Sequence, residues 1–285
     1  MKLVRTIADL TRDRPLQGTS QGAGPRTGLV PTMGAFHAGH LALFAAAREE
    51  NDVVVASLFV NPAQFGPAED LDRYPRDEER DARLAEEAGV DVLFTPSVDE
   101  MYPDGYGTWV DVGELGRRLE GEFRPDHFRG VATVCLKLFN IVRPDRAYFG
   151  QKDAQQAAVV KQLVRDLNLE LEIRVVPTVR DEDGLALSSR NAYLSPEERE
   201  AALTLPRSLW AGRDAFVTGS DPAKEAQRFL NSLDVDYVEV ADLDGQKVLA
   251  AAVRVGKTRL IDNVVLEVPG QDSSRLGRTS KGDSK

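Results

Sequence analysis

The 285-residue sequence contains a single cysteine, three histidines and no long apolar run. Cys135 lies in the apolar run VATVCLKLF, so a zinc site of the cysteine–histidine type has too few ligands. A membrane span needs about 20 consecutive apolar residues, and no stretch approaches that length. The N-terminus, MKLVRTIADL, has no apolar core followed by a small-residue cleavage site and does not resemble a secretion signal. We therefore expect a cytoplasmic protein that does not interact with membranes.

Positive charge is also in deficit. Lysine and arginine number 36 against 46 aspartates and glutamates, which gives a net charge of −10. Because the phosphate backbone attracts basic surfaces, this balance argues against nucleic acid, including tRNA, as a partner. Much of the acid lies in residues 69–91, which we expect to form the solvated face of a helix. The hydrophobic content of 42% and the length suffice for one large domain or two smaller ones with a substantial core.

Strand-like and helix-like segments alternate over the first 177 residues. The expected strands are residues 28–31, 53–60, 90–95, 146–149 and 171–176. The expected helices are residues 4–11, 39–50, 76–88, 130–142 and 153–167. Alternation of this kind predicts an α/β fold with a Rossmann-like, doubly wound parallel sheet and crossover helices. Ligands of such sheets bind outside the carboxyl ends of the strands.

The pattern changes after residue 177. Residues 180–195 are polar and rich in turn formers. Helices and then strands are expected beyond them, near residues 196–218, 221–233, 235–241 and 247–268. We therefore predict a Rossmann-like domain over residues 1–177 and a smaller C-terminal α/β domain over residues 178–270 that closes over ATP. Residues 271–285 have the composition of a disordered tail.

The turn after the first of these strands carries chemically unusual residues. Residues 29–40 read LVPTMGAFHAGH: an apolar run ends at Pro31, small residues follow, and His37 and His40 open an apolar-periodic run. This is the pattern of a strand, a tight turn and a helix N-terminus, where unpaired N–H groups and the helix dipole favour anions. Two imidazoles one turn apart, kept neutral by the positive helix end, suit phosphate binding. A helix cap beside a surface histidine, or half of a metal site, would give the same pair.

Two further polar segments are candidates for phosphate contacts. The segment GQKD at residues 150–153 begins a helix, where Lys152 is unfavourable for the helix dipole unless an anion binds there. The segment SSR at residues 188–190 offers hydroxyl and guanidinium groups that can grip phosphate oxygens. By contrast, VGKT at residues 255–258 is no P-loop, because Ala251 stands where the leading glycine is required.

We call residues 29–40 the histidine turn, residues 150–153 the lysine turn and residues 188–190 the serine–arginine loop. Together they resemble the nucleotidyltransferase superfamily with its His-x-Gly-His motif. Six segments then narrow the match: PTMGAFHAGH, SLFVNPAQFG, YPRD, FRPDHFRGVATVCLKLFNIVRPDRAYFGQKDAQQ, VVPTVRDEDGLALSSRN and GKTRLIDN. They closely resemble the pantothenate synthetases, or pantoate–β-alanine ligases, and run in that family's order through most of residues 27–265. The resemblance implies ATP-dependent condensation of pantoate with β-alanine to pantothenate through a pantoyl-adenylate intermediate, with release of pyrophosphate and AMP.

The resemblance also implies roles for individual residues. Gln64 and Gln156 match the pantoate-binding glutamines, Gln64 is also associated with β-alanine, and His40 matches the catalytic position, that of a general acid. The residues implied in ATP binding are Met33, Gly34, Ala35, Phe36, His37, Ala38, Gly39, His40, Gly150, Gln151, Lys152, Asp153, Val179, Leu187, Ser188, Ser189 and Arg190. A neutral amide suits pantoate because it orients a carboxylate without the charge pairing that weakens a nucleophile. Without the resemblance, both glutamines would be interpreted as surface or capping residues.

Several features stay open at this point. Pro31, Met33 and Phe59 are candidates for an apolar wall around the methyl groups of pantoate, although Phe59 suits a hydrophobic core equally well. ATP implies Mg²⁺, for which no protein ligand is identified. The family implies a homodimer. The competing functions are a nucleotidyltransferase that leaves the nucleotide on its product and a nucleotide-binding regulatory module without turnover.

Three positions depart from the commonest pattern of the family. Ala38 is often acidic in the family, Ala154 often aromatic and Leu187 often methionine, so the packing of the substrates is in question there rather than the chemistry. His127 lies in a family motif, and structural hydrogen bonding is the role that we expect for it.

Overall fold

The computed structural model describes residues 1–12, 24–67 and 69–267. Six strands form the larger sheet in the order β1-β4-β3-β2-β5-β6, and their pairings are parallel. The bounds of these strands are Lys2–Val4 (β1), Thr27–Thr32 (β2), Val53–Leu58 (β3), Val92–Phe94 (β4), Arg146–Gly150 (β5) and Glu172–Val176 (β6). The predicted doubly wound α/β fold is confirmed.

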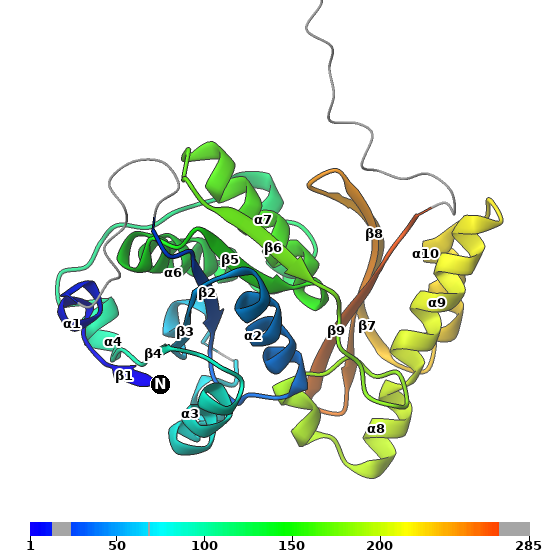
Figure 1. Ribbon diagram of the computed structural model, residues 1–285. Helices are drawn as coiled ribbons and strands as arrows, with labels where there is room; N and C mark the ends of the chain where they lie inside the picture. Colours follow the sequence, from blue (N-terminus) through cyan, green and yellow to red (C-terminus); the bar gives the residue numbers. More distant parts are fainter. Residues whose placement is uncertain (13–23, 68, 268–285) are drawn as a thin grey trace, which may run out of the picture.

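Helices cover both faces of this sheet (Figure 1). One face carries α1 (Ile7–Arg12), α6 (His127–Val142) and α7 (Ala154–Asp166), which pack on Leu29 and Val55 of the central strands. The other face carries α2 (Ala38–Glu50) and α3 (Glu78–Glu87), which pack on Val30 and Val54. Successive strand residues point to opposite faces, and both faces are buried. This is why the central strands are recognisable in the sequence as apolar runs.

Short elements lie between these main ones. They are η1 (Pro62–Gln64), η2 (Leu71–Arg73), α4 (Val98–Met101), η3 (Gly113–Gly116), α5 (Glu120–Phe123) and η4 (Gln151–Asp153). One prediction at the N-terminus is wrong: residue 4 belongs to strand β1, and the helix that was expected from residue 4 begins at Ile7. Strand β1 pairs with β4, with Lys2 opposite Val92, so its partner lies far away in the sequence.

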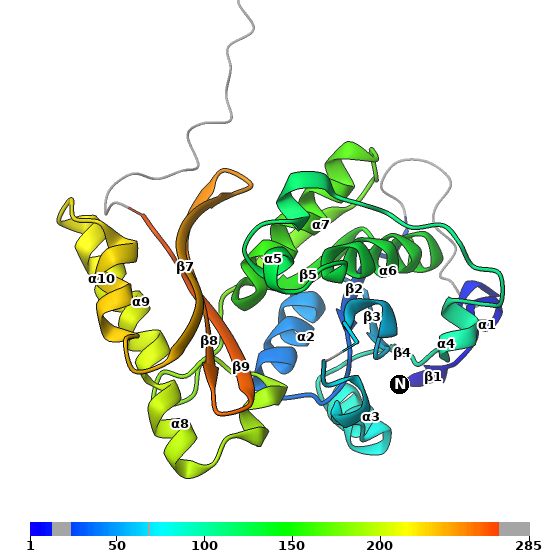
Figure 2. The same cartoon turned by 180° about the vertical axis from the view of Figure 1, so that it is seen from behind.

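A second, antiparallel sheet follows in the order β7-β8-β9. Its strands are Asp234–Leu243 (β7), Gln246–Val255 (β8) and Thr258–Val265 (β9). The helices of this part are α8 (Pro196–Ala202), α9 (Thr204–Val217) and α10 (Pro222–Phe229), after η5 (Ser189–Tyr193). They pack on one face of the small sheet around Leu205, Leu209 and Leu249. The sheet lies between these helices and the larger domain (Figure 2), and its other face contacts α7 through Ala154 and Ala250.

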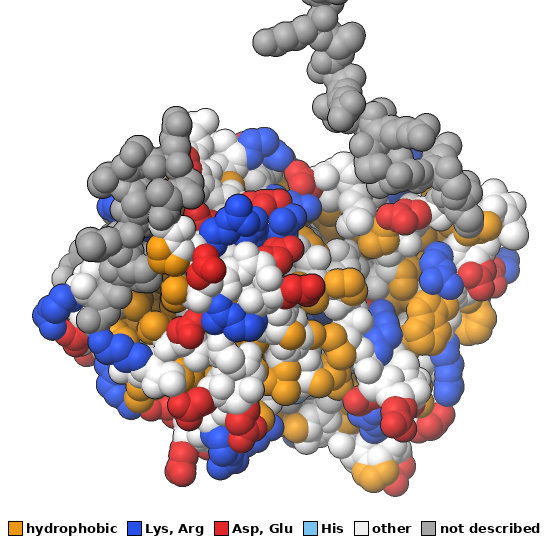
Figure 3. All heavy atoms as spheres, in the orientation of Figure 1, with side chains coloured by type: hydrophobic (Ala, Val, Ile, Leu, Met, Phe, Trp, Pro, Cys, Tyr) orange, Lys and Arg blue, Asp and Glu red, His pale blue; other side chains and the backbone are white. Residues whose placement is uncertain are grey.

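The surface and the chain ends add three points. Acidic and basic side chains are interspersed over the face of the described part that Figure 3 shows. Among the described residues, no helix combines the length and the apolar character that a membrane crossing requires. The predicted tail, residues 271–285, lies outside the described residues, and the predicted domain boundary at residue 177 stays a prediction.

Candidate active site

Most of the predicted site residues converge on one cavity of ≈ 230 Å³ at the carboxyl ends of β2, β5 and β6. Those that line it are Pro31, Met33, His37, Gly39, His40, Phe59, Gln64, Gly150, Lys152, Asp153, Gln156, Val179, Leu187, Ser188, Ser189 and Arg190. Helix α6 adds an apolar wall of Val131, Val134, Cys135 and Leu138. The predicted residues that do not line this cavity are Gly34, Ala35, Phe36, Ala38 and Gln151. A wider cleft of ≈ 850 Å³ adjoins the cavity and shares Lys152, Asp153 and Arg190 with it.

His37 and His40 cap the first turn of α2 with their imidazole rings. Nδ1 of His37 accepts a hydrogen bond from the backbone N–H of Gly39 (3.1 Å), and Nδ1 of His40 accepts one from the N–H of His37 (3.3 Å). A backbone N–H only donates, so in each neutral ring the proton is on Nε2. The ring centroids are 4.2 Å apart, and both residues line the cavity. The helix cap therefore presents two Nε2–H groups as neutral donors.

Burial keeps both rings uncharged at neutral pH. It lowers the pKa of His37 to about 4, and the positive charge of Lys152 adds to this effect. Burial also lowers the pKa of His40 to about 3, with further contributions from His37 and Lys152. The sequence indicated neutrality on the ground of the helix dipole, whereas in the structure burial is the main cause.

The turn between β2 and α2 is held from α3 by a buried carboxylate. Asp81 is 1% exposed, and its two oxygens accept hydrogen bonds from the N–H groups of Ala35 (2.6 Å) and Phe36 (2.8 Å). The expectation that residues 69–91 form a solvated helix face is therefore wrong for Asp81. Phe36 is buried against the ring of His40, at 5.3 Å between centroids. These residues shape the turn from behind, and two of its backbone N–H groups are already bound.

The amide of Gln64 has only one consistent orientation. Oδ1 of Asn61 accepts from the backbone N–H of Ala63 (3.2 Å), and its Nδ2 donates to the carbonyl oxygen of Gly130 (3.2 Å). The same Nδ2 donates to Oε1 of Gln64 (3.0 Å). Because the two backbone partners fix the amide of Asn61, they also fix that of Gln64, and its Nε2–H₂ group is left as the donor. Gly130 permits this approach, because a Cβ there would lie 2.1 Å from the carbonyl oxygen of Ala63.

The backbone of Gln64 is bound from α6 and the segment before it. Its carbonyl oxygen lies 2.9 Å from Nδ1 of His127 and accepts from Nη2 of Arg124 (3.2 Å). Nη1 of Arg124 lies 3.3 Å from Nε2 of His127, and a guanidinium only donates. His127 therefore carries its proton on Nδ1, the opposite tautomer to His37 and His40. Burial, followed by the charge of Arg124, lowers the pKa of His127 to about 4. These contacts agree with the structural hydrogen bonding that the sequence analysis expected for His127.

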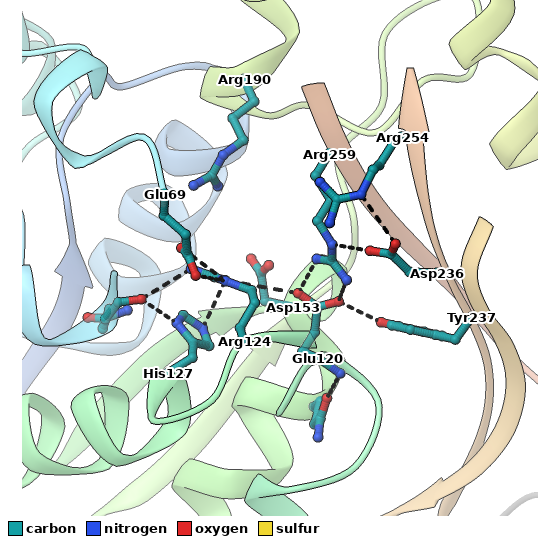
Figure 4. Close-up of polar contacts among 12 residues, drawn as sticks. Glu69, Glu120, Arg124, His127, Asp153, Arg190, Asp236, Tyr237, Arg254 and Arg259 are labelled. Carbon is teal, nitrogen blue, oxygen red and sulfur yellow. Dashed lines mark hydrogen bonds and ion pairs between the residues drawn. The ribbon is translucent and has the colours of Figure 1, made fainter. Parts of the chain in front are cut away.

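Arg124 also belongs to an ion-pair network that reaches the small sheet (Figure 4). Glu69 accepts from Nη2 of Arg124 (2.7 Å), and a carboxylate oxygen of Glu120 lies 3.9 Å from Nη1. Glu120 accepts two hydrogen bonds from Arg259 of β9 (2.6 and 2.7 Å), which also donates to Asp236 (2.6 Å). Burial raises the pKa of Glu120, but the contacts with Arg259 outweigh burial and the net shift is downward. Glu120 is therefore a buried carboxylate that stays charged.

The cationic side of the cavity is formed by two segments. Lys152 lies in η4, directly after β5, and its Nζ is 3.5 Å from Oδ1 of Asp153. Ser188 caps η5 and accepts from the N–H of Arg190 (3.3 Å). The guanidinium of Arg190 makes two hydrogen bonds with Asp70 (2.9 and 3.0 Å), which leaves Nη1 for another acceptor. The cavity thus combines an ammonium group, a half-engaged guanidinium and hydroxyl groups on one wall.

Sequence reasoning did not single out several residues that the structure places here. Asn61, Arg124 and Tyr74 all serve the site, the first two through Gln64 and the third as part of the cavity wall. All three stand inside the six segments of the family resemblance, but only the three-dimensional contacts reveal what they do. Thr178 lines the cavity too, and within the described part its Oγ1 is buried without a hydrogen-bond partner. A ligand atom is the natural partner for such a hydroxyl.

Comparisons with known proteins agree with this arrangement. A family model for pantoate–β-alanine ligase matches residues 2–265. A pantothenate synthetase from Acetivibrio thermocellus is 52% identical over 94% of this chain and 100% of its own length. One from Moorella thermoacetica is 54% identical over 94% and 99%.

Solved structures give the same result. Pantothenate synthetase from Thermus thermophilus has a TM-score of 0.88 with 48% identity, covering 93% of this chain and 99% of that one. Pantoate–β-alanine ligase from Francisella tularensis, solved in complex with beta-gamma ATP and β-alanine, has a TM-score of 0.79 with 36% identity, covering 93% and 97%. The chain belongs to the pantoate–β-alanine ligase family.

Proposed function

We propose that this chain makes pantothenate in two steps. One group of cavity residues binds the triphosphate of ATP, and another binds pantoate. The supporting observation is that donors for a triphosphate and donors for a carboxylate face the same small cavity. His37, His40 and Lys152 lie on one side, and Gln64 and Gln156 line the same space together with the apolar wall. The apolar wall suits the methyl groups of pantoate, and the amides suit its carboxylate.

In the first step, a carboxylate oxygen of pantoate attacks the α-phosphorus of ATP. The bond from that phosphorus to the bridging oxygen breaks, and pyrophosphate leaves with the electron pair. His40 donates its Nε2–H to the oxygen on which negative charge grows, while Lys152 and the serine–arginine loop bind the phosphates. At neutral pH a ring with a pKa of about 3 acts as a hydrogen-bond donor rather than as a source of a proton.

In the second step, the amine of β-alanine attacks the acyl carbon of pantoyl adenylate. The C–N bond forms, the C–O bond to the phosphate breaks, and AMP leaves; the amine loses its proton to solvent. In this scheme the Nε2–H₂ group of Gln64 holds the acyl group through both steps, and its orientation by Asn61 supports that role. The adjoining cleft of ≈ 850 Å³ offers β-alanine a route to the adenylate.

Magnesium enters this scheme with ATP. Mg²⁺ at nucleotide sites is held largely by substrate phosphates and water, with only one or two carboxylates from the protein. Within the described residues, no group of three or more histidine, cysteine, aspartate or glutamate side chains is arranged to hold a metal ion. We therefore assign the ion to the Mg·ATP complex and give it no protein cage.

Two other predictions from the sequence belong to this proposal. A cytoplasmic location agrees with the single cysteine, which is buried as a free thiol. A homodimer is the assembly that the family resemblance implies, and sedimentation of the purified protein measures it directly.

A burst experiment tests the two-step scheme. With ATP and pantoate but no β-alanine, rapid-quench analysis is expected to show pyrophosphate at about one equivalent per active site, because the adenylate is shielded from water. A burst that appears only with β-alanine would contradict the two-step scheme. A stable nucleotidyl product would favour a nucleotidyltransferase, and no turnover with any substrate combination would favour a regulatory module. AMP release that requires all three substrates distinguishes the ligase from both.

A further inference from the structure

The motif GKTRLIDN, which the proposed function leaves without a role, ends with two buried polar residues. Asp262 is 2% exposed and Asn263 is 5% exposed, and both lie in β9 of the small sheet. Adjacent strand residues point to opposite faces, so these side chains reach different parts of the molecule. One reaches the turn that carries Lys152, and the other reaches the hairpin that leads to Ser188.

Asn263 holds the lysine turn through three hydrogen bonds. Its Nδ2 donates to the carbonyl oxygens of Gln151 (2.9 Å) and Lys152 (2.8 Å), and its Oδ1 lies 3.2 Å from Nε2 of Gln151, which donates to it. Both carbonyls can only accept, so the amide has one orientation. A residue of the small sheet therefore fixes the backbone that presents Lys152 to the cavity. The same contacts turn the side chain of Gln151 toward the small sheet, and its contact with ATP stays a prediction.

Asp262 holds the hairpin before the serine–arginine loop. Its carboxylate accepts two hydrogen bonds from Arg180, at 2.6 and 2.9 Å. Arg180 forms a backbone bridge with Ala186, and the N–H of Leu187 donates to the carbonyl oxygen of Val179 (3.0 Å). A bidentate, charge-assisted pair of this kind restricts orientation as well as distance. Asp262 therefore anchors the chain that enters the serine–arginine loop, and the next residue, Asn263, anchors the lysine turn.

We propose that Asp262 and Asn263 are positioning residues that set the lysine turn and the serine–arginine loop at a fixed separation across the ATP site. The inference rests on the proposed function, in which both segments bind the triphosphate. Consecutive Cα atoms are about 3.8 Å apart, so one peptide unit of β9 links the two anchors. Neither residue lines the cavity that contains His37 and His40. Asp262 lines the adjoining cleft, but its carboxylate is bound there by Arg180, so each residue acts through the segment that it holds.

Asn263→Ala deletes the three hydrogen bonds and is the first test. In single-turnover adenylation, we expect the rate to fall about 10- to 100-fold, because a displacement of about 1 Å at a reacting group costs rates of this order. The KM for ATP is expected to rise, whereas the KM for pantoate stays unchanged. Arg165→Gln is the matched control, because it breaks the exposed ion pair with Asp244 (2.8 Å) between the same two domains and leaves both constants unchanged.

A double-mutant cycle with Lys152→Ala separates positioning from general loss of structure. If Asn263 acts through Lys152, then Asn263→Ala adds little to the defect of Lys152→Ala, whereas independent effects add. Two results would overturn the positioning role of Asn263 while leaving the role of Lys152 intact. They are full additivity of the two defects, and a normal rate for Asn263→Ala when Lys152→Ala is impaired. If Lys152→Ala adenylates normally, the proposed role of Lys152 fails, and the positioning role fails with it. Should thermal melting show that Asn263→Ala unfolds, the isosteric Asp262→Asn decides, with a raised KM for ATP expected and unchanged constants contradicting the inference.

Discussion

Asn61→Asp reverses the hydrogen-bond polarity beside Gln64 without changing the shape of the side chain. In the native protein, Nδ2 of Asn61 donates to Oε1 of Gln64 (3.0 Å) and to the carbonyl oxygen of Gly130 (3.2 Å). A carboxylate has no proton to donate, so three oxygens would face one another. The amide of Gln64 relieves this repulsion by rotating, which turns its Nε2–H₂ group toward the carboxylate and its oxygen toward pantoate.

The expected cost follows from the exchange of a donor for an acceptor. A hydrogen bond to a charged group contributes about 1.5–3 kcal/mol, which corresponds to about 10- to 150-fold in kcat/KM for pantoate. The apposed oxygens add repulsion, so we expect the upper part of this range, with the KM for ATP unchanged. Initial rates with each substrate varied at saturating levels of the others measure both constants.

Tyr102→Phe is the control for this substitution. It removes the hydroxyl that donates to Oδ1 of Asn61 (2.9 Å), but that oxygen still accepts from the N–H of Ala63 (3.2 Å). The orientation of both amides therefore survives, and we expect only a small change in the use of pantoate. Equal rises in the KM for ATP and for pantoate in Asn61→Asp, or an unchanged constant for pantoate, would refute the argument from amide orientation.

Four further predictions concern the histidines and the ion-pair network of Glu120. His40→Ala should slow adenylation about 10²–10⁴-fold, with a far smaller change in ATP affinity measured by calorimetry. His37→Ala should mainly weaken ATP binding. A His40→Ala variant that binds ATP poorly but adenylates normally at saturation would reverse this assignment. Burial lowers the pKa of His37 to about 4 and of His40 to about 3, so adenylation should not lose activity through these rings between pH 8 and 5. In the unfolded chain these histidines have an ordinary pKa of about 6.5, so as the pH falls they bind protons before the folded chain does. Urea denaturation should therefore show the free energy of unfolding falling as the pH drops from about 6.5 toward 4. Glu120→Ala should lower the free energy of unfolding by about 1.5–3 kcal/mol, because it removes two hydrogen bonds of the partly buried Arg259 and leaves Asp236 as its ion-pair partner. Arg118→Gln, which breaks an exposed pair with Glu239, should cost at most about 1 kcal/mol; equal losses in urea denaturation would contradict the distinction.

The sequence was sufficient for strands β2 to β6 of the main sheet and for the motifs that meet at the cavity. Strands β2, β3 and β5 are buried on both faces, so each is visible as an apolar run, and the motifs at their ends fall together because parallel strands end at one edge. Strand β1 was missed for the opposite reason. It has three residues, and only its pairing with β4 makes it a strand.

The burial of Asp81 could not be predicted from the local sequence pattern. Its place in a run of acidic residues indicated a solvated position, and for its neighbour Glu79 that prediction holds. Asp81 is buried because its partners are two backbone N–H groups more than forty residues earlier in the chain. Backbone donors leave no trace in a sequence, so no motif distinguishes this aspartate from the acidic residues around it. The same applies to Asn263, whose two carbonyl partners lie in η4, more than 110 residues earlier in the chain.

The charge state of the site follows from the cost of burial. Burial, partial at His37 and His40 and nearly complete at His127, keeps all three histidines neutral. Their tautomers are set by the groups that each ring contacts: backbone N–H groups at His37 and His40, a guanidinium at His127. Positive charge at the cavity comes from Lys152, Arg190 and Arg124, of which Arg190 is paired with Asp70 and Arg124 with Glu69. Neutral imidazole donors bind the phosphates of ground-state ATP less strongly than charged donors would. A neutral donor gains most where negative charge grows during the reaction, so in the proposed function His40 favours the transition state of adenylation, whereas His37 contributes to binding the phosphates of ATP.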